Sequence, residues 1–155
     1  MSLPECDVQY LTEREIAHEV VTDAGMVCVL LPEWKLPAGL NVAETTVLFR
    51  LAAGYPDVAP DMWWCSPEVR RADGSIIRAT ELTEQYLGRS WQRWSRHFTA
   101  GQWKSGIDGF ESYIALTSIH AQQIPLRWPS REPEPEPSTT PPGNGQVQFG
   151  EAGLE

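Results

Sequence analysis

The sequence has no set of cysteines or histidines that could organise a fold or a metal site. Its three cysteines are odd in number, lie far apart and include no Cys-x-x-Cys pair: Cys6, Cys28 and Cys65. This pattern disfavours both a disulfide framework and a zinc site. No ligand spacing joins the three histidines, His18, His97 and His120, so we expect no metal and no other cofactor.

Long apolar runs and a basic surplus are also missing. The longest apolar run, Met26–Leu31, is far shorter than the roughly 20 residues of a membrane-spanning helix. The first residues, MSLPECDVQ, lack the basic and apolar regions of a signal peptide. A formal net charge of -9 argues against binding nucleic acid or an anionic membrane, although Arg70, Arg71 and Arg78 could contact an acidic partner. These absences predict a soluble, cytoplasmic protein.

A change of composition at Trp128 divides the chain. A length of 155 residues suits one domain with its own core, and we predict that domain over residues 1–128. The remainder contains the run REPEPEPSTTPPGNGQ, which has almost nothing to bury. Residues 129–155 are therefore predicted to be a disordered Pro/Glu-rich tail. Whether this tail recruits a partner or only aids solubility stays open.

Apolar periodicity and turn residues predict an α+β fold. Two segments rich in Val, Ile and Leu, separated by Thr22-Asp23-Ala24-Gly25, are typical of a β-hairpin. The prolines and glycine at residues 32–41 should break any regular element. We expect an N-terminal helix at residues 7–14 and a four-strand antiparallel meander at residues 16–21, 26–31, 45–51 and 62–65. A partly helical segment at residues 79–87 and a long C-terminal helix at residues 105–122 should follow.

The densest stretch is Trp91–Trp103, WQRWSRHFTAGQW, which places three of the seven tryptophans around Ser95, Arg96 and His97. Large aromatic side chains bury much area and can fix neighbouring polar groups, so this stretch is a candidate preorganised site. The alternative is that the tryptophans are core residues and the polar residues form a solvated turn.

Three blocks of sequence resemble the ubiquitin-conjugating enzymes. The Tyr-Pro, then Pro, pattern at residues 55–60 is similar to the element after that family's third strand, and Ser-Pro-Glu-Val at residues 66–69 is similar to its His-Pro-Asn segment. GYPDVAPDMWW, GRSWQRWSRH and QWKSGIDGFESY together resemble a bacterial branch found beside ubiquitin-like proteins, activating-enzyme-like adenylating proteins and metalloprotease-type deconjugases. The resemblance covers residues 5–123 and implies a ubiquitin-conjugating-enzyme-like fold, with an N-terminal helix, a four-strand antiparallel meander and several C-terminal helices. This agrees with the α+β layout.

The departures from the family pattern concern the chemistry. Gly74 is followed by Ser-Ile-Ile-Arg where the resemblance implies a catalytic cysteine. The family's oxyanion-stabilising asparagine corresponds to Glu68, whose carboxylate would repel a developing negative charge. A cysteine-thioester mechanism at this position is therefore not expected.

Acyl transfer needs a nucleophile, a base and oxyanion donors. Ser95, Arg96 and His97 have suitable residue types for an oxygen ester, because an imidazole can take the proton of a serine hydroxyl. The side chains of residues i and i+2 diverge on a continuous helix, so Ser95 and His97 could act together only if the backbone turns between them. Alternatively, His97 assists attack by an acceptor amine or only caps a loop. The substrate-binding candidates that would frame this site are Trp91, Trp94, Trp103, Tyr55 and Asp61.

Other side chains offer weaker chemistry. Cys65 is the alternative nucleophile, but burial in a strand would disfavour its thiolate and leave it an inert core cysteine. Asp57 and Asp61 could form an acid and base pair, or they could be turn residues whose carboxylates accept backbone hydrogen bonds.

Two functions are therefore expected from the resemblance. The first is a ubiquitin-conjugating-like protein of a bacterial pathway that receives or positions a ubiquitin-like modifier's C-terminus from an activating-enzyme-like partner, through a non-cysteine (oxyester) intermediate. A deconjugating protease of the same pathway would be a further partner. The second is a catalytically inactive adaptor that binds the ubiquitin-like protein or its activating enzyme. An unrelated α+β domain, in which the Tyr-Pro element is a coincidence, is the third and remotest alternative.

Overall fold

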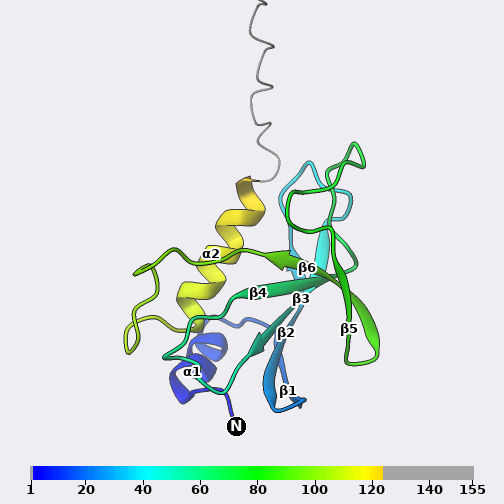
Figure 1. The fold of residues 1–155 in the computed structure, drawn as a ribbon. Helices are drawn as coiled ribbons and strands as arrows, with labels where there is room; N and C mark the ends of the chain where they lie inside the picture. The colour runs from blue at the N-terminus through cyan, green and yellow to red at the C-terminus, as the bar shows by residue number, and fades with distance from the viewer. Residues whose placement is uncertain (1, 124–155) are drawn as a thin grey trace, which may run out of the picture.

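The computed structural model describes residues 2–123, and Figure 1 shows their arrangement. The elements in this range are α1 (Glu5–Glu13), β1 (Glu19–Asp23), β2 (Met26–Lys35), β3 (Glu44–Leu51), β4 (Met62–Ser66), β5 (Thr83–Tyr86), β6 (Arg89–Ser95) and α2 (Phe110–Gln123). The strands form one antiparallel sheet in the order β1-β2-β3-β4-β6-β5. The α+β prediction is confirmed. The predicted tail lies outside the described residues, so the domain boundary stays a prediction.

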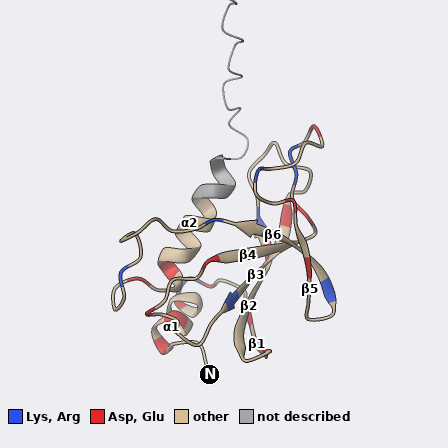
Figure 2. Ribbon diagram, viewed as in Figure 1, with Lys and Arg blue, Asp and Glu red and all other residues tan. Residues whose placement is uncertain are grey.

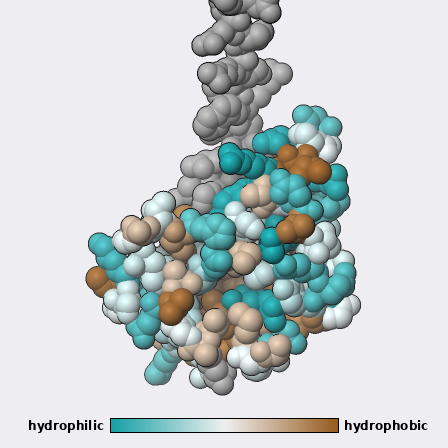
Figure 3. Space-filling model, viewed as in Figure 1, coloured by the Kyte–Doolittle hydropathy of each residue, from teal (hydrophilic) through white to brown (hydrophobic). Residues whose placement is uncertain are grey.

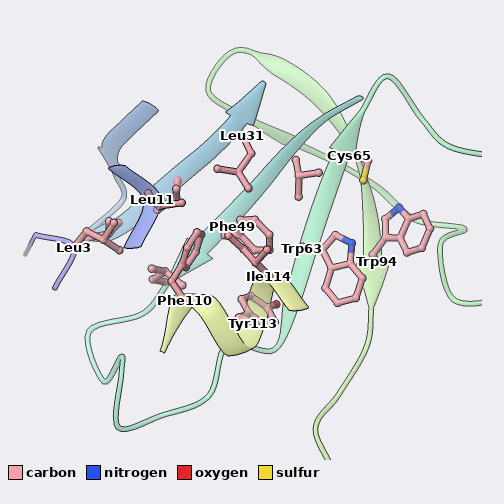
Figure 4. Packing of buried hydrophobic residues seen from close by; sticks show 14 of the residues in the cluster. Leu3, Leu11, Leu31, Phe49, Trp63, Cys65, Trp94, Phe110, Tyr113 and Ile114 are labelled. Carbon is pink, nitrogen blue, oxygen red and sulfur yellow. The ribbon is translucent and has the colours of Figure 1, made fainter. Parts of the chain in front are cut away.

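Strand alternation gives the sheet two different faces. Successive side chains of a strand point to opposite sides, so Trp63 and Trp64 of β4 enter separate clusters. On the face that carries both helices, Phe49 packs edge-on against Phe110 at 5.0 Å and Tyr113 at 5.1 Å between ring centroids (Figure 4). This is the main core.

The opposite face holds a smaller cluster built from Cys28, Leu48, Trp64 and Trp91. Arginine side chains cover part of it. The Arg50 guanidinium lies 3.8 Å from the centroid of the Tyr86 ring, and that of Arg89 lies 4.3 Å from the Trp91 ring. Neither described helix contributes a core residue to this face, yet Trp91 is fully buried. The arginines account for this, because long charged side chains can shield apolar surface with their stems.

The predicted four-strand meander corresponds to β1–β4, but the sheet continues through β6 to β5. The prediction of a partly helical segment at residues 79–87 is wrong. Thr83–Tyr86 is a strand that pairs with β6 through a two-residue turn at Leu87 and Gly88, which have φ of 51° and 73°. Positive φ at both positions is typical of a tight hairpin turn. Gly88 therefore ends a strand instead of a helix.

Several element boundaries also differ from the prediction. α1 spans Glu5–Glu13 instead of residues 7–14, and β1 spans Glu19–Asp23 instead of residues 16–21, so Thr22 and Asp23 belong to the strand and not to the turn. β2 continues past Pro32 to Lys35, because a register shift between Leu31 and Trp34 accommodates the extra residues before Trp34 pairs with Thr45. The long helix was predicted from residue 105 but begins at Phe110. Ile107, which lies inside the predicted range, is 78% exposed in the loop before the helix. The described residues contain a single helix after the sheet, not several.

A buried carboxylate joins the helices to the loop between β3 and β4. Asp7 of α1 is only 4% exposed. Its Oδ2 accepts a hydrogen bond from the Tyr55 hydroxyl at 2.6 Å, and its Oδ1 accepts one from the Phe110 backbone N–H at 3.0 Å. Negative charge at a helix N-terminus is favourable, so Asp7 fixes where α2 begins. A side chain at Gly109 would place its Cβ 2.9 Å from Asp7 Oδ1, so any larger residue there would displace the Asp7 carboxylate.

We predict that Asp7→Ala lowers the free energy of unfolding by about 2–4 kcal/mol, because it leaves two buried donors without an acceptor. Glu5→Ala is the matched control in the same helix, since Glu5 is exposed and makes no such contact, and it should cost less than about 1 kcal/mol. Chemical denaturation of both variants measures the difference. Equal stability of the two would contradict the role given to Asp7.

Candidate functional site

The tryptophans of the Trp91–Trp103 stretch lie in three different settings. Trp94 belongs to the main core, where it stacks on Trp63 with ring centroids 5.9 Å apart. Trp91 lies in the cluster on the other face and donates its indole N–H to the Tyr86 carbonyl at 2.9 Å. Trp103 lies in the segment after β6 and donates to the Pro56 carbonyl at 2.9 Å. They therefore do not line one common site.

His97 and Asp61 form an exposed pair at one end of the β4–β6 ladder. The His97 Nδ1 contacts Asp61 Oδ1, and the two side chains are 64% and 56% exposed. When the imidazole is neutral, a carboxylate at Nδ1 favours the tautomer with the proton on that nitrogen. Nε2 is then an acceptor that faces no hydrogen-bond partner within residues 2–123. The arrangement can take a proton from an incoming group.

Asp61 also acts on the core beneath it. Tyr113 of α2 donates its hydroxyl hydrogen to the Met62 carbonyl at 2.8 Å. Burial raises the pKa of Tyr113 far above its usual value, and the negative charge of Asp61 raises it further. Tyr113 therefore stays neutral, and it holds the first residue of β4 in place beside the pair.

Ser95 is the last residue of β6 and pairs with Met62 of β4. Its Oγ lies 4.0 Å from the Met62 sulfur, a weak contact, and its backbone N–H donates to the Ala79 carbonyl at 3.0 Å. No hydrogen bond joins Ser95 Oγ to His97 among the described residues. Ser95 and His97 are separated by one residue at the point where the chain leaves the sheet, but their side chains do not form a catalytic pair in this structure.

Arg96 is held by backbone carbonyls. Its Nη1 and Nη2 each donate at 2.9 Å, to the Ser95 carbonyl and the Arg78 carbonyl, and the guanidinium lies 5.4 Å from the centroid of the Trp94 ring. Burial lowers the pKa of Arg96 from its ordinary value. Arg96 thus ties residue 78 to the end of β6.

Tyr55 is 8% exposed and belongs to the main core, so its contact with Asp7 makes it a support for the β3–β4 loop rather than a surface group. Burial, followed by the hydrogen bond to Asp7, raises the pKa of Tyr55 far above its usual value. Asp57 and Asp61 do not pair with each other. Asp57 contacts the Ser105 hydroxyl, whereas Asp61 contacts His97.

The region where the family pattern implies a cysteine is an exposed turn. Ser75 donates its hydroxyl hydrogen to Asp73 Oδ1 at 2.6 Å, and its backbone N–H binds the same oxygen at 2.8 Å. Glu68 forms an ion pair with Arg70, with 3.0 Å between Oε1 and the Arg70 Nε. The Glu68 carboxylate is an acceptor and has no proton to donate to an oxyanion. These contacts stabilise the turn.

Sequence reasoning missed the contact between Asp61 and His97, although both residues were candidates. They are 36 residues apart, so no local spacing reveals them. The usable signal is the strand pairing: once Met62 is opposite Ser95, the residues just beyond the two strand ends must be close. Within residues 2–123, no group of three or more His, Cys, Asp or Glu is placed to hold a metal ion.

Exposed apolar side chains are scattered over the surface. The most exposed are Ile107, Val58, Leu82 and Ile76, and Figure 3 shows separate brown areas on the visible face instead of one continuous patch. No described helix is long and apolar enough to cross a membrane. The visible face therefore offers small local features rather than a broad apolar docking surface.

The comparisons with known proteins give one match. The family model described as "Prokaryotic E2 family E" matches residues 3–123, which is most of the chain. No curated protein and no solved structure matches.

We predict that Cys65 and Cys28 resist alkylation in the folded protein. Cys65 is 3% exposed and Cys28 is fully buried, whereas Cys6 is exposed. Burial raises the pKa of the Cys65 thiol far above its usual value, so almost no reactive thiolate forms at pH 7 to 9. Iodoacetamide followed by intact-mass measurement should add one group to the native chain and three after unfolding. Rapid native modification of Cys65 would show that it is accessible as a nucleophile.

Proposed function

Because the chain belongs to prokaryotic E2 family E, which suggests a role in ubiquitin-like conjugation, we propose that it receives or positions the C-terminus of a ubiquitin-like modifier. An activating-enzyme-like adenylating protein would supply that C-terminus, and a deconjugating protease of the same pathway would reverse the product. The observation that carries the proposal is an exposed imidazole oriented by a carboxylate, the His97–Asp61 pair, in a chain of this family.

The proposed nucleophile is not a cysteine. The raised pKa of buried Cys65 argues against a thiolate there, and no cysteine follows Gly74. In the oxygen-ester route, Ser95 Oγ attacks the activated carbonyl carbon of the modifier, a C–O bond forms, and the bond to the activating partner breaks. The hydroxyl proton passes to His97 Nε2, which later returns it to the leaving group.

This route requires Ser95 and His97 to come together when the modifier's tail binds. Hydrogen bonds of a catalytic pair are often long or misaligned before substrate arrives, and both residues lie where β6 ends and the chain continues as an irregular segment. In a second form of the proposal, His97 instead takes the proton of an acceptor amine that attacks a modifier held by the partner. Asp61 orients the imidazole in either form.

The adaptor function remains the alternative, and it has its own support. Tyr55, Trp91 and Arg96, all candidates for a site, make contacts that stabilise the fold. Among the described residues, the one side-chain contact of Ser95 Oγ that resembles a hydrogen bond is the weak one to the Met62 sulfur. An adaptor would use the same fold to bind the modifier or its activating enzyme without forming an adduct.

We predict that Ser95→Ala and His97→Ala each reduce adduct formation with purified modifier, activating partner and ATP by about 100-fold or more, because nucleophile and base act as one unit. Intact mass identifies the adduct, and an oxygen ester should be cleaved by hydroxylamine but not by thiol reductants. His18→Ala is the matched control, since within residues 2–123 the hydrogen-bond partner of His18 is the Ile16 carbonyl at 2.7 Å.

Several outcomes decide between the functions. If both variants charge as well as the parent, the catalytic assignment is wrong. If the parent forms no adduct yet binds the modifier or activating partner, the adaptor function is supported. If only His97→Ala impairs transfer and no adduct forms, the acceptor-amine form holds. His97→Ala should leave thermal stability nearly unchanged, because exposed ion pairs contribute little to it.

A further inference from the structure

A small recess lies beside Ser95, on the sheet face opposite the helices. It has a volume of about 160 Å³ and is lined by Ala79, Glu81, Leu82, Arg93 and Ser95. Two backbone hydrogen bonds fix its walls: Arg93 N–H donates to the Leu82 carbonyl at 2.8 Å, and Ser95 N–H to the Ala79 carbonyl at 3.0 Å. A water molecule occupies about 30 Å³ in the liquid, so the recess can hold a few heavy atoms.

Arg93 gives the recess unused hydrogen-bond donors. Its Nη1 donates to Glu84 Oε1 at 2.9 Å, and this uses one of the five N–H groups of a guanidinium. Its Nε is buried without a partner in the described part of the chain and is closed to a ligand. The side chain as a whole is 25% exposed, so the donors that remain for a ligand are those of the terminal Nη groups. A cation with spare donors at the edge of a recess can bind a carboxylate or a carbonyl oxygen.

The other charged group of the recess is already engaged. Glu81 Oε1 accepts the Ala79 backbone N–H at 2.9 Å. Hydrogen bonds from backbone N–H groups, first its own and then that of Ala79, lower the pKa of Glu81, and the nearby charge of Arg96 lowers it further. The Glu81 carboxylate is thus committed to the loop. β5 contains the acidic Glu84 and no Lys or Arg, and Figure 2 shows red as well as blue positions around β5 and β6, whereas the charged positions of α1 are red.

The backbone at the recess is held in an uncommon conformation. Ala79 has a φ of 60°, in the left-handed region that favours glycine. A residue with a Cβ stays there only when its surroundings hold it, and such residues cluster at binding sites. Here the conformation is held from both sides, since the Ala79 N–H binds Glu81 and its carbonyl binds Ser95.

We propose that this recess binds the C-terminal carboxyl or acyl group of an extended peptide, with Arg93 contacting the oxygen. This assignment rests on the proposed function, which makes the peptide the C-terminal end of the ubiquitin-like modifier. Ser95 Oγ, on the same side of β6 as Arg93, then lies beside the carbonyl carbon of the modifier. Arg93 then supplies the donors to the oxyanion that Glu68 cannot supply.

The test uses N-acetyl-glycylglycine as the probe and the full chain labelled with nitrogen-15. We expect saturable amide shifts at residues 79–82 and 93–95 on titration. N-acetyl-glycylglycine amide should bind about 10-fold more weakly or worse, since it lacks the negative charge of the terminal carboxylate. Arg93→Gln should weaken binding of the probe by about 10- to 100-fold, and Arg93→Lys by less.

Glu84→Gln is the control for a structural effect. It removes the ion pair of Arg93 with Glu84 while leaving Arg93 in the recess, and it should bind the probe within about 3-fold of the parent. If Glu84→Gln weakens binding as much as Arg93→Gln, the effect is structural and the proposal is wrong. The absence of saturable shifts, or equal binding of acetate and the peptide, would also overturn it.

The outcome separates this inference from the proposed function. Probe binding that depends on Arg93 supports the recess even if Ser95→Ala and His97→Ala charge normally, in which case only the catalytic assignment falls. The opposite result is charging that is lost in Ser95→Ala but unchanged in Arg93→Gln, together with no binding of the probe. That result would overturn the proposed role of the recess and leave the proposed function standing.

Discussion

The antiparallel pairing of β4 with β6 is the constraint on which the site depends. Its register sets Trp63 opposite Trp94, buried and stacked, and Met62 opposite Ser95. A slip of one residue would turn every side chain of β6 to the other face of the sheet and expose Trp94. Burial of Trp94 therefore fixes the register, and the register brings Asp61 to His97 just beyond the strand ends. The polar site is a consequence of how the core packs.

Contacts with other parts of the fold hold the segment after β6 at several points. Trp103 binds the Pro56 carbonyl, and Ser105 contacts Asp57, both in the loop between β3 and β4. At its far end, α2 begins where its first N–H meets buried Asp7. The two loops thus support each other, with the His97–Asp61 contact at one end and the Asp7 junction at the other. Functional groups need this kind of support to keep their geometry.

The sequence predicted the parts of the fold that carry strong local signals. Alternating or continuous apolar residues and a turn with glycine identified β1–β4, and helical spacing identified α2. β5 was missed because Thr83–Tyr86 is short and largely polar, an edge strand stabilised only by pairing with β6. The start of α2 depends on Asp7, which is 103 residues away, and no local pattern contains that contact. β6 was missed as well, because its tryptophans were taken as the frame of a polar site. Once Arg89–Ser95 is recognised as a strand, the odd spacing of Trp91 and Trp94 places their side chains on opposite faces.

The central claim is that Asp61 holds His97 with a free Nε2 at the exposed end of the β4–β6 ladder. The most direct measurement is the tautomer of His97, from nitrogen-15 NMR of the imidazole at a pH where the ring is neutral. The account predicts that Nδ1 carries the proton in the parent and that Asp61→Asn reduces this preference. A ring with its proton mainly on Nε2, or a tautomer that Asp61→Asn does not change, would contradict the account.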